Sequence, residues 1–186
     1  MVDVVDANDI QKLNLVPTND PILRVKIDLD PFNSDLVWSN DGEVVGHEEK
    51  MFNTMVHNYG IGLASPQVGD AVRFFAMRHS TKGHIGVYNP EILDVSDEQV
   101  TMEEGCLSFP ALFIHLTRPK TIKVKYQDSN KKEVVEELDE WDSRIFQHEY
   151  DHLDGRLFIE YASDFKLQRA IKKRDKLLKK FSQARK

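Results

Sequence analysis

The sequence predicts an α+β fold in which short mixed or antiparallel strands pack around a central metal-binding helix, with an amphipathic helix at the C-terminus. Residues 147–152 read Gln-His-Glu-Tyr-Asp-His, a pattern that places two histidines on one helix face. Segments rich in β-branched and aromatic residues precede this helix and predict strands. Residues 164–186 combine an apolar stripe with many basic residues. Strands grouped before the metal helix indicate a mixed α+β order.

The first half of the chain is expected to begin irregularly and then form one helix. Residues 1–35 contain Pro17, Pro21 and Pro31, which interrupt any long helix. A helix is expected over residues 41–59 and to end at Gly60, because apolar residues recur there at helical spacing. Strands are then expected over three segments: Val72–Met77, Ile85–Tyr88 and Thr121–Tyr126.

The His-Glu-x-x-His pattern indicates a metal site on the following helix. His148 and His152 lie one above the other at about 3.6 residues per turn, so their imidazoles can bind one ion. Glu149 lies beside the first ligand, where it can act as general base without binding the metal. A solvated helix would give the same short pattern, and a catalytic site needs a third protein ligand.

Two further segments contain candidate metal-binding or substrate-binding residues. Cys106 is the only cysteine in 186 residues, so it forms no intrachain disulfide; it is either a third metal ligand or a buried apolar side chain. Residues 60–69, Gly-Ile-Gly-Leu-Ala-Ser-Pro-Gln-Val-Gly, let backbone approach backbone or ligand closely. Gln67 is an uncharged donor suited to an oxygen that becomes negative during reaction. An ordinary helix exit capped by Gly60 remains the alternative.

Together these segments resemble the peptide deformylase family, whose signatures Gly-x-Gly-Leu-Ala-x-Pro-Gln, Glu-Gly-Cys-Leu-Ser and Gln-His-Glu-x-Asp-His-Leu-x-Gly occur here in order. The resemblance implies a metal-dependent amidohydrolase that removes the N-formyl group from the initiator methionine of new polypeptides. It implies that the ligands are Cys106, His148 and His152, that Glu149 is general base and acid, and that Gln67 and the Leu107 backbone N–H bind the oxyanion. One divalent ion is expected, Fe(II) in the cell, although Zn, Ni or Co also suit these ligands.

Substrate contacts are expected near the same segments. An extended N-formylmethionyl peptide can pair with backbone near Ile61 and Gly62, and Ile61 and Ile145 are candidates for the methionine pocket. Trp141, Arg144 and Ile145 should fall near the His148 face, although core packing or a salt bridge at Arg144 explains them equally well. Two positions depart from the family: Ser65 replaces an alanine and adds a hydroxyl near the substrate groove, and Phe113 lies where some members have a basic residue.

Composition is that of one globular domain. The chain is 40% hydrophobic and 30% charged, with no apolar run near the ~20 residues of a membrane span. We expect a catalytic region over residues 1–163 and a basic helix over 164–186 within one domain. The acidic start resembles no signal peptide and the single cysteine suits a reducing compartment, so a cytoplasmic location is expected. The remaining histidines are interpreted as surface or structural: His47, His57, His79, His84 and His115.

The C-terminal segment is electrically distinct from the rest. Residues 164–186 carry ten basic and two acidic residues, a formal charge of +8 in a chain of net −6. An apolar stripe at helical spacing comprises Leu167, Ile171, Leu178 and Phe181. The helix is either a solvated element docked on the domain or, as the resemblance implies, a segment that docks on ribosomal RNA through its basic face.

Two other functions fit parts of the pattern. A metal-dependent endopeptidase would use His-Glu-x-x-His, but such enzymes take their third ligand from His or Glu and have no need of the Cys106 segment. A catalytically silent, ribosome-associated protein could keep the metal for folding. The presence of Glu149 and Gln67 argues against that second alternative.

Overall fold

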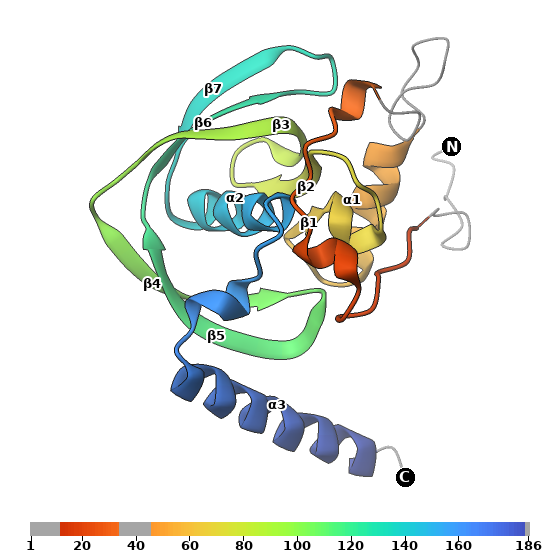
Figure 1. Cartoon of the computed structure of the whole chain (residues 1–186), viewed down its shortest axis with the longest axis vertical. Helices are drawn as coiled ribbons and strands as arrows, with labels where there is room; N and C mark the ends of the chain where they lie inside the picture. Colours follow the sequence, from red (N-terminus) through yellow and green to blue (C-terminus); the bar gives the residue numbers. More distant parts are fainter. Residues whose placement is uncertain (1–11, 34–45, 185–186) are drawn as a thin grey trace, which may run out of the picture.

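The computed structural model places one helix, α2 (Glu140–Leu153), at the centre of two antiparallel sheets (Figure 1). It describes residues 12–33 and 46–184. The larger sheet has five strands in the order β1-β2-β3-β6-β7, and the smaller sheet pairs β4 with β5. The predicted α+β fold with a central helix is confirmed.

All seven strands of the described residues precede α2, as the order of sequence patterns predicted. Their bounds are Gly62–Ala64 (β1), Phe74–His79 (β2), Gly83–Val95 (β3), Gln99–Cys106 (β4), Phe109–Pro119 (β5), Ile122–Gln127 (β6) and Glu133–Leu138 (β7). Two further helices, α1 (His47–His57) and α3 (Asp164–Ala184), flank the sheets. Every strand pair is antiparallel.

The three predicted strands are confirmed as parts of β2, β3 and β6, with shifted bounds. In β6 the side chains of Ile122, Val124 and Tyr126 are buried while Lys123 is exposed, which is the alternation the sequence showed. β3 runs to Val95, well past the predicted end at Tyr88. The strands β1, β4, β5 and β7 were not predicted.

Helix α1 lies inside the predicted range 41–59, whose first five residues fall outside the described part of the chain. The predicted end at Gly60 is wrong. The helix ends at His57, and the left-handed residue after it is Tyr59, with φ of 59°. Gly60 is needed for another reason, because a Cβ there would lie 2.8 Å from Cδ1 of Leu107.

The N-terminal segment is irregular where the structure describes it, as the prolines predicted. Residues 12–33 contain only two short 3-10 helices, Pro21–Arg24 and Pro31–Asn33. The rest of the predicted irregular stretch, residues 1–11 and 34–35, lies outside the described residues.

Three apolar clusters hold these layers together. One packs α2 against the inner face of the larger sheet, where the Phe146 ring meets the Phe75 ring edge-on at 5.1 Å. A second packs α1 on the other face of β2, through Met51 and Met55. The third lies between β5 and the start of α3. Because apolar neighbours lie on both sides of α2, eleven of its fourteen residues are buried, including polar ones.

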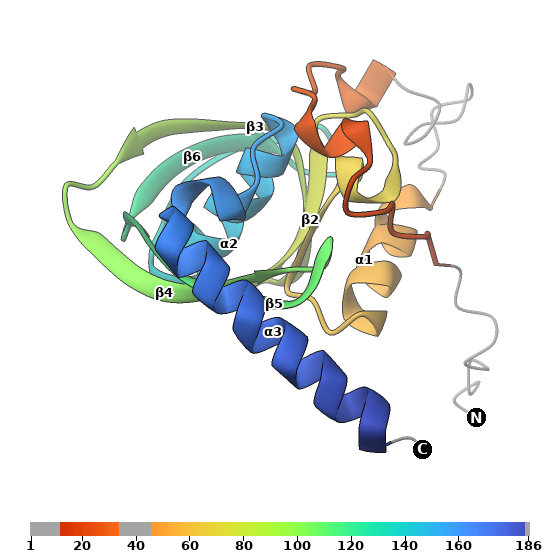
Figure 2. The ribbon, with the colours of Figure 1, turned by 60° about the horizontal axis from the view of Figure 1, so that its bottom comes forward.

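Helix α3 packs on the domain only near its start and extends away from it (Figure 2). Leu167, Ala170 and Ile171 contact the cluster that contains Leu112 and Phe158. Leu178 and Phe181 of the predicted stripe are 47% and 61% exposed, whereas Leu167 and Ile171 are partly buried. Within the described residues, no helix has the length and apolar character that crossing a membrane requires.

Candidate metal centre

Three possible metal ligands converge from two elements, β4 and α2. Cys106 ends β4, while His148 and His152 lie one turn apart on α2. Their ligand atoms all lie within 4.8 Å of one another, and Cys106 Sγ is 3.3 Å from His152 Nε2. No second group of this kind occurs among the residues that the structure describes. The structure therefore brings together the ligand set that the sequence indicated.

The chemistry of this triad fits one divalent ion. Burial would raise the pKa of the Cys106 thiol, but the charges and hydrogen bonds of His152 and His148 lower that pKa well below its usual range. A thiolate and two imidazoles are donors that Zn²⁺ and Fe(II) accept. The histidine rings stand 5.2 Å apart, centre to centre, as expected for neighbours on one helix face.

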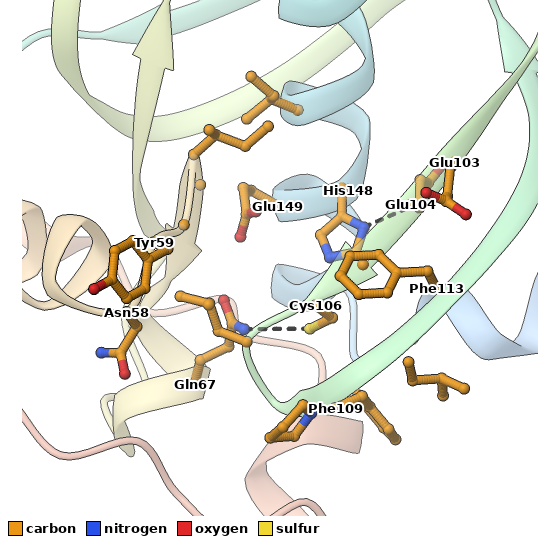
Figure 3. Close-up of a pocket in the computed structure, with 18 of the residues that line it drawn as sticks. Asn58, Tyr59, Gln67, Glu103, Glu104, Cys106, Phe109, Phe113, His148 and Glu149 are labelled. Atoms are coloured by element: carbon orange, nitrogen blue, oxygen red, sulfur yellow. Dashed lines mark hydrogen bonds and ion pairs between the residues drawn. The ribbon is translucent and has the colours of Figure 1, made fainter. Parts of the chain in front are cut away.

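Glu149 projects from α2 into the cavity on the same side as His148 and Cys106 (Figure 3). Its side chain is buried, and its Oε2 has no hydrogen-bond partner in the described protein. Burial raises the pKa of Glu149 to about 7, against the opposing effect of His148 and His152. Gly62 makes room for this carboxylate, because a Cβ there would lie 2.2 Å from Oε1.

The side-chain amide of Gln67 points at the Cys106 thiol. It lies in the 3-10 helix Ser65–Val68, where its Oε1 accepts a 2.8 Å hydrogen bond from the backbone N–H of Ala64. Its Nε2 donates to Ser108 Oγ at 3.1 Å and to Cys106 Sγ at 3.4 Å. The amide is therefore oriented with its N–H groups toward the triad. Leu107 follows Cys106 directly, so its backbone N–H is close to the same point.

Glu104 is a site residue that the sequence analysis missed. Its Oε2 lies 3.0 Å from His148 Nδ1, which leaves the other ring nitrogen of His148 for the metal. The same carboxylate accepts from Arg118 Nε at 2.7 Å and from Arg144 Nη1 at 2.6 Å. Although burial would raise the pKa of Glu104, the hydrogen bonds from His148 and Arg118 lower it far below its ordinary value.

This buried charge network continues to Asp151, which is also on the metal helix. Arg118 donates to Asp151 Oδ2 at 2.6 Å, and the Tyr161 hydroxyl donates to Asp151 Oδ1 at 2.8 Å. The sequence held one signal for this network: Glu104 lies two residues before Cys106, hence on the same face of an extended strand. Arg118 and Tyr161 carry no comparable local signal. Arg144 is salt-bridged, as one of the sequence interpretations proposed.

A cavity of about 870 Å³ is lined by Cys106, His148 and Glu149. The predicted substrate contacts all line it: Ile61, Gly62 and Ile145, together with Trp141, Arg144 and Phe113. Ile145 is buried, whereas Ile61 is 41% exposed at the rim.

The expectation for Ser65 is wrong in one respect. Its side chain is fully buried and does not line the cavity, so the added hydroxyl lies away from the substrate groove. Its Oγ has no hydrogen-bond partner in the described protein. Of the histidines outside the triad, His47 and His79 are buried and His57, His84 and His115 are exposed, which agrees with structural and surface roles.

Comparisons with known proteins agree on one family. The profile of the family described as polypeptide deformylase matches residues 12–168. A peptide deformylase of Thermotoga maritima is 50% identical over 118 residues, 63% of this chain and 71% of that protein. One from Bartonella tribocorum is 39% identical over 166 residues, 86% of this chain and 89% of that protein. The crystal structure of the Thermotoga maritima peptide deformylase superposes with a TM-score of 0.73 at 42% identity, covering 82% of this chain and 99% of that one.

Proposed function

The chain belongs to the polypeptide deformylase family and hydrolyses the N-formyl group of peptides at its metal centre, and we propose that Glu149 moves the proton in this reaction. The observation that carries this role is the unpaired, buried Oε2 of Glu149 beside the triad. Its raised pKa of about 7 suits a group that must both take and give a proton near neutrality.

The proton route follows from the position of Glu149. A divalent ion held by Cys106, His148 and His152 supplies Lewis acidity, which lowers the pKa of water and polarises a carbonyl. Glu149 takes one proton as the water oxygen bonds to the formyl carbon. It then gives a proton to the peptide nitrogen as the carbon–nitrogen bond breaks, which releases formate and a free amine. Without that proton the amine would be a very poor leaving group.

Gln67 and the backbone N–H of Leu107 are proposed to stabilise the negative oxygen that forms during the attack. Support comes from the fixed orientation of the Gln67 amide, whose Nε2 lies 3.4 Å from Cys106 Sγ. A donor held in place beforehand needs no reorganisation during the reaction, and losing one such donor costs about 3 kcal/mol of barrier.

The proposed substrate is the N-formylmethionyl end of a nascent polypeptide. Ile61, Gly62 and Ile145 would bind it, with the methionine side chain between the two isoleucines. Supporting this, all three residues line the cavity, and β1 is an edge strand of the larger sheet. An extended peptide can therefore pair with its open edge.

Fe(II) is the proposed ion in the cell, while Zn, Ni or Co would also suit the donor set. Loading the metal-free protein anaerobically with each ion separates them. Activity of the Fe(II) form should fall on exposure to air while the Ni form persists, because Fe(II) and the thiolate are both oxidised. If both forms kept the same activity after exposure to air, the expected oxygen sensitivity of the Fe(II) form would be contradicted.

A further proposal concerns α3, which we take as part of the same domain as residues 1–163. Its first turns pack on the core, whereas the basic distal part extends free of it. We propose that this part binds ribosomal RNA, since phosphates attract Lys and Arg without sequence preference. Removing residues 175–186 should abolish co-sedimentation with ribosomes and leave hydrolysis of a short formyl peptide unchanged. Unaltered sedimentation would refute the docking.

The cytoplasm is the proposed compartment. The only cysteine is a metal ligand, and a thiolate ligand stays reduced in such a compartment.

The experiment that tests the function measures formate released from formyl-Met-Ala-Ser by the protein loaded anaerobically with Fe(II). Glu149→Gln should bind the metal but lose turnover by roughly 10²-fold or more. Cys106→Ala should lose the metal itself. A blocked, unformylated peptide with an internal bond serves as control, because its cleavage would favour an endopeptidase. Parental turnover in Glu149→Gln would contradict the proposed role.

A further inference from the structure

A buried serine contacts the Gln67 amide from outside the cavity. Ser108 is 3% exposed and lies in the turn between β4 and β5, two residues after Cys106. Its Oγ accepts a 3.1 Å hydrogen bond from Gln67 Nε2. Gln67 and Cys106 line the cavity, whereas Ser108 does not. Any effect of the Ser108 hydroxyl on the reaction must therefore pass through a neighbouring residue.

The Gln67 amide is held at both of its polar ends. A side-chain amide offers two N–H donors and one carbonyl acceptor. Gln67 Oε1 accepts from the backbone N–H of Ala64 at 2.8 Å. Nε2 donates to Ser108 Oγ and, at 3.4 Å, to Cys106 Sγ, the contact dashed in Figure 3. The opposite orientation of the amide would set Nε2 against the Ala64 N–H, donor against donor. Ser108 thus takes one N–H, and the other points toward the sulfur and the cavity.

The Ser108 contact fixes what the other two contacts leave free. The terminal torsion of a glutamine side chain is broad, so packing on the chain alone does not set the plane of the amide. The Ala64 contact holds the Oε1 end, and the Cys106 sulfur also serves as a metal ligand. Ser108 Oγ is then the oxygen that holds Nε2 in place. The serine is itself anchored, because the Thr18 hydroxyl donates to Ser108 O at 2.6 Å.

We propose that Ser108 is a positioning residue, whose hydroxyl holds one N–H of Gln67 so that the second N–H is aimed at the oxygen that becomes negative during hydrolysis. The inference rests on the proposed function and on the proposed role of Gln67. A donor aimed beforehand strengthens its hydrogen bond as the negative charge develops and needs no reorganisation at that moment. Losing the aim should therefore lower kcat and leave KM nearly unchanged.

The test is a double-mutant cycle on formate release from formyl-Met-Ala-Ser by the metal-loaded protein. Ser108→Ala should lower kcat about tenfold and change KM by less than about twofold. Gln67→Ala should lower kcat by roughly 10²-fold, the usual cost of a lost oxyanion donor. Adding Ser108→Ala to Gln67→Ala should lower kcat by no more than about a further twofold, because no amide is left to position. A serine that only supported the Leu107 turn would cost the same factor in both backgrounds.

Ser143→Ala is the matched control for lost stability. Ser143 is also a buried serine whose Oγ accepts from a glutamine amide, at 2.9 Å from Gln147 Nε2, but neither of these two residues lines the cavity. This variant should keep the parental kcat although it loses a similar buried hydrogen bond.

A second measurement follows the Gln67 amide itself. In the metal-loaded protein without substrate, the side-chain N–H protons of Gln67 should exchange with solvent faster in Ser108→Ala than in the parent, and at the parental rate in Ser143→Ala. Parental kcat in Ser108→Ala, or an equal loss in both backgrounds of the cycle, would overturn the positioning role, while formate release by the parent still upholds the deformylase. Absence of formate with the metal-loaded parent would overturn the proposed function and this inference with it.

Discussion

Gly62 has no side chain because the Glu149 carboxylate occupies that space. Its backbone is ordinary strand, so conformational freedom does not explain the glycine. A Cβ at this position would instead lie 2.2 Å from Glu149 Oε1 and 2.7 Å from its Cδ. The proposed substrate-binding edge and the proposed general base are therefore in contact.

Gly62→Ala should consequently impair the reaction while the protein still binds its metal. The new methyl group would push the Glu149 carboxylate away from the triad, so kcat should fall by roughly 10²-fold, the usual contribution of a placed general base. Formate release and metal content, measured on the same sample, check this. Parental kcat would show that the carboxylate tolerates the displacement.

Ser65 carries a hydroxyl that the core does not satisfy. Its side chain is fully buried, and its Oγ lacks a hydrogen-bond partner among the described residues. Removing an unpaired buried polar atom gains stability, so Ser65→Ala should raise the free energy of unfolding by about 1 kcal/mol. Denaturant unfolding of the metal-free protein measures it.

Ser143 offers the matched control for that substitution. It is also fully buried, but its Oγ accepts a 2.9 Å hydrogen bond from Gln147 Nε2. Ser143→Ala should therefore lower the free energy of unfolding. If Ser65→Ala were also destabilising, the hydroxyl at Ser65 would have a partner after all.

Single residues could be predicted where the chemistry is local in sequence. His148, Glu149 and His152 fall within one turn and a half of helix, so their spacing alone predicted their common face. Arg118 could not be found this way, because its role depends on contacts of β5 with β4 and α2. A lone buried arginine has no sequence signature.

At the scale of elements, the N-terminal segment forms hydrogen bonds to both segments that carry the proposed oxyanion donors. Val16 donates its backbone N–H to Gln67 O at 2.9 Å. Two residues on, the Thr18 hydroxyl donates to Ser108 O at 2.6 Å, in the turn that contains Leu107. Ser108 Oγ in turn accepts from the Gln67 amide. One short irregular segment thus holds the Gln67 helix and the Leu107 turn together.

Thr18→Val should remove the hydrogen bond to Ser108 O, at a position that does not line the cavity. We expect kcat to fall roughly tenfold, less than the loss of a whole oxyanion donor, with KM changed less than about twofold. Thr18→Ser keeps the hydroxyl and should restore most of kcat. A change in KM alone, or no rescue by serine, would argue against this positioning role.

Strands were predictable where one side is apolar, or where both sides are, as in β2. β6 alternates cleanly and was found, and β5 buries Leu112, Ile114 and Leu116 at every second position, a signal that the sequence analysis did not use. β7 and β4 are rich in glutamate and have several exposed positions, so their hydrogen-bond partners define them more than their composition does. Pairing between distant segments decides such strands.

Over the whole molecule, the sequence predicted the charge asymmetry and the C-terminal helix but not where that helix leaves the domain. Apolar residues recur at helical spacing between Leu167 and Phe181, and this spacing predicts an amphipathic helix without saying how much of it docks on the domain. In the structure, only the first turns of α3 pack on core residues. The extent of docking depends on the surface beneath the helix, which no local pattern reports.

Two truncations should therefore behave differently. Ending the chain after Ser163 removes Leu167, Ala170 and Ile171 and uncovers the cluster that contains Leu112 and Phe158, so the free energy of unfolding should fall by at least about 2 kcal/mol. Ending it after Arg174 keeps those contacts, and the removed side chains of residues 175–183 are exposed, so stability should change by less than about 0.5 kcal/mol. Denaturant unfolding of both variants measures the difference. Equal loss in the two would mean that the distal turns of α3 also support the domain, and a ribosome-binding defect in the shorter deletion could then no longer be assigned to its basic surface alone.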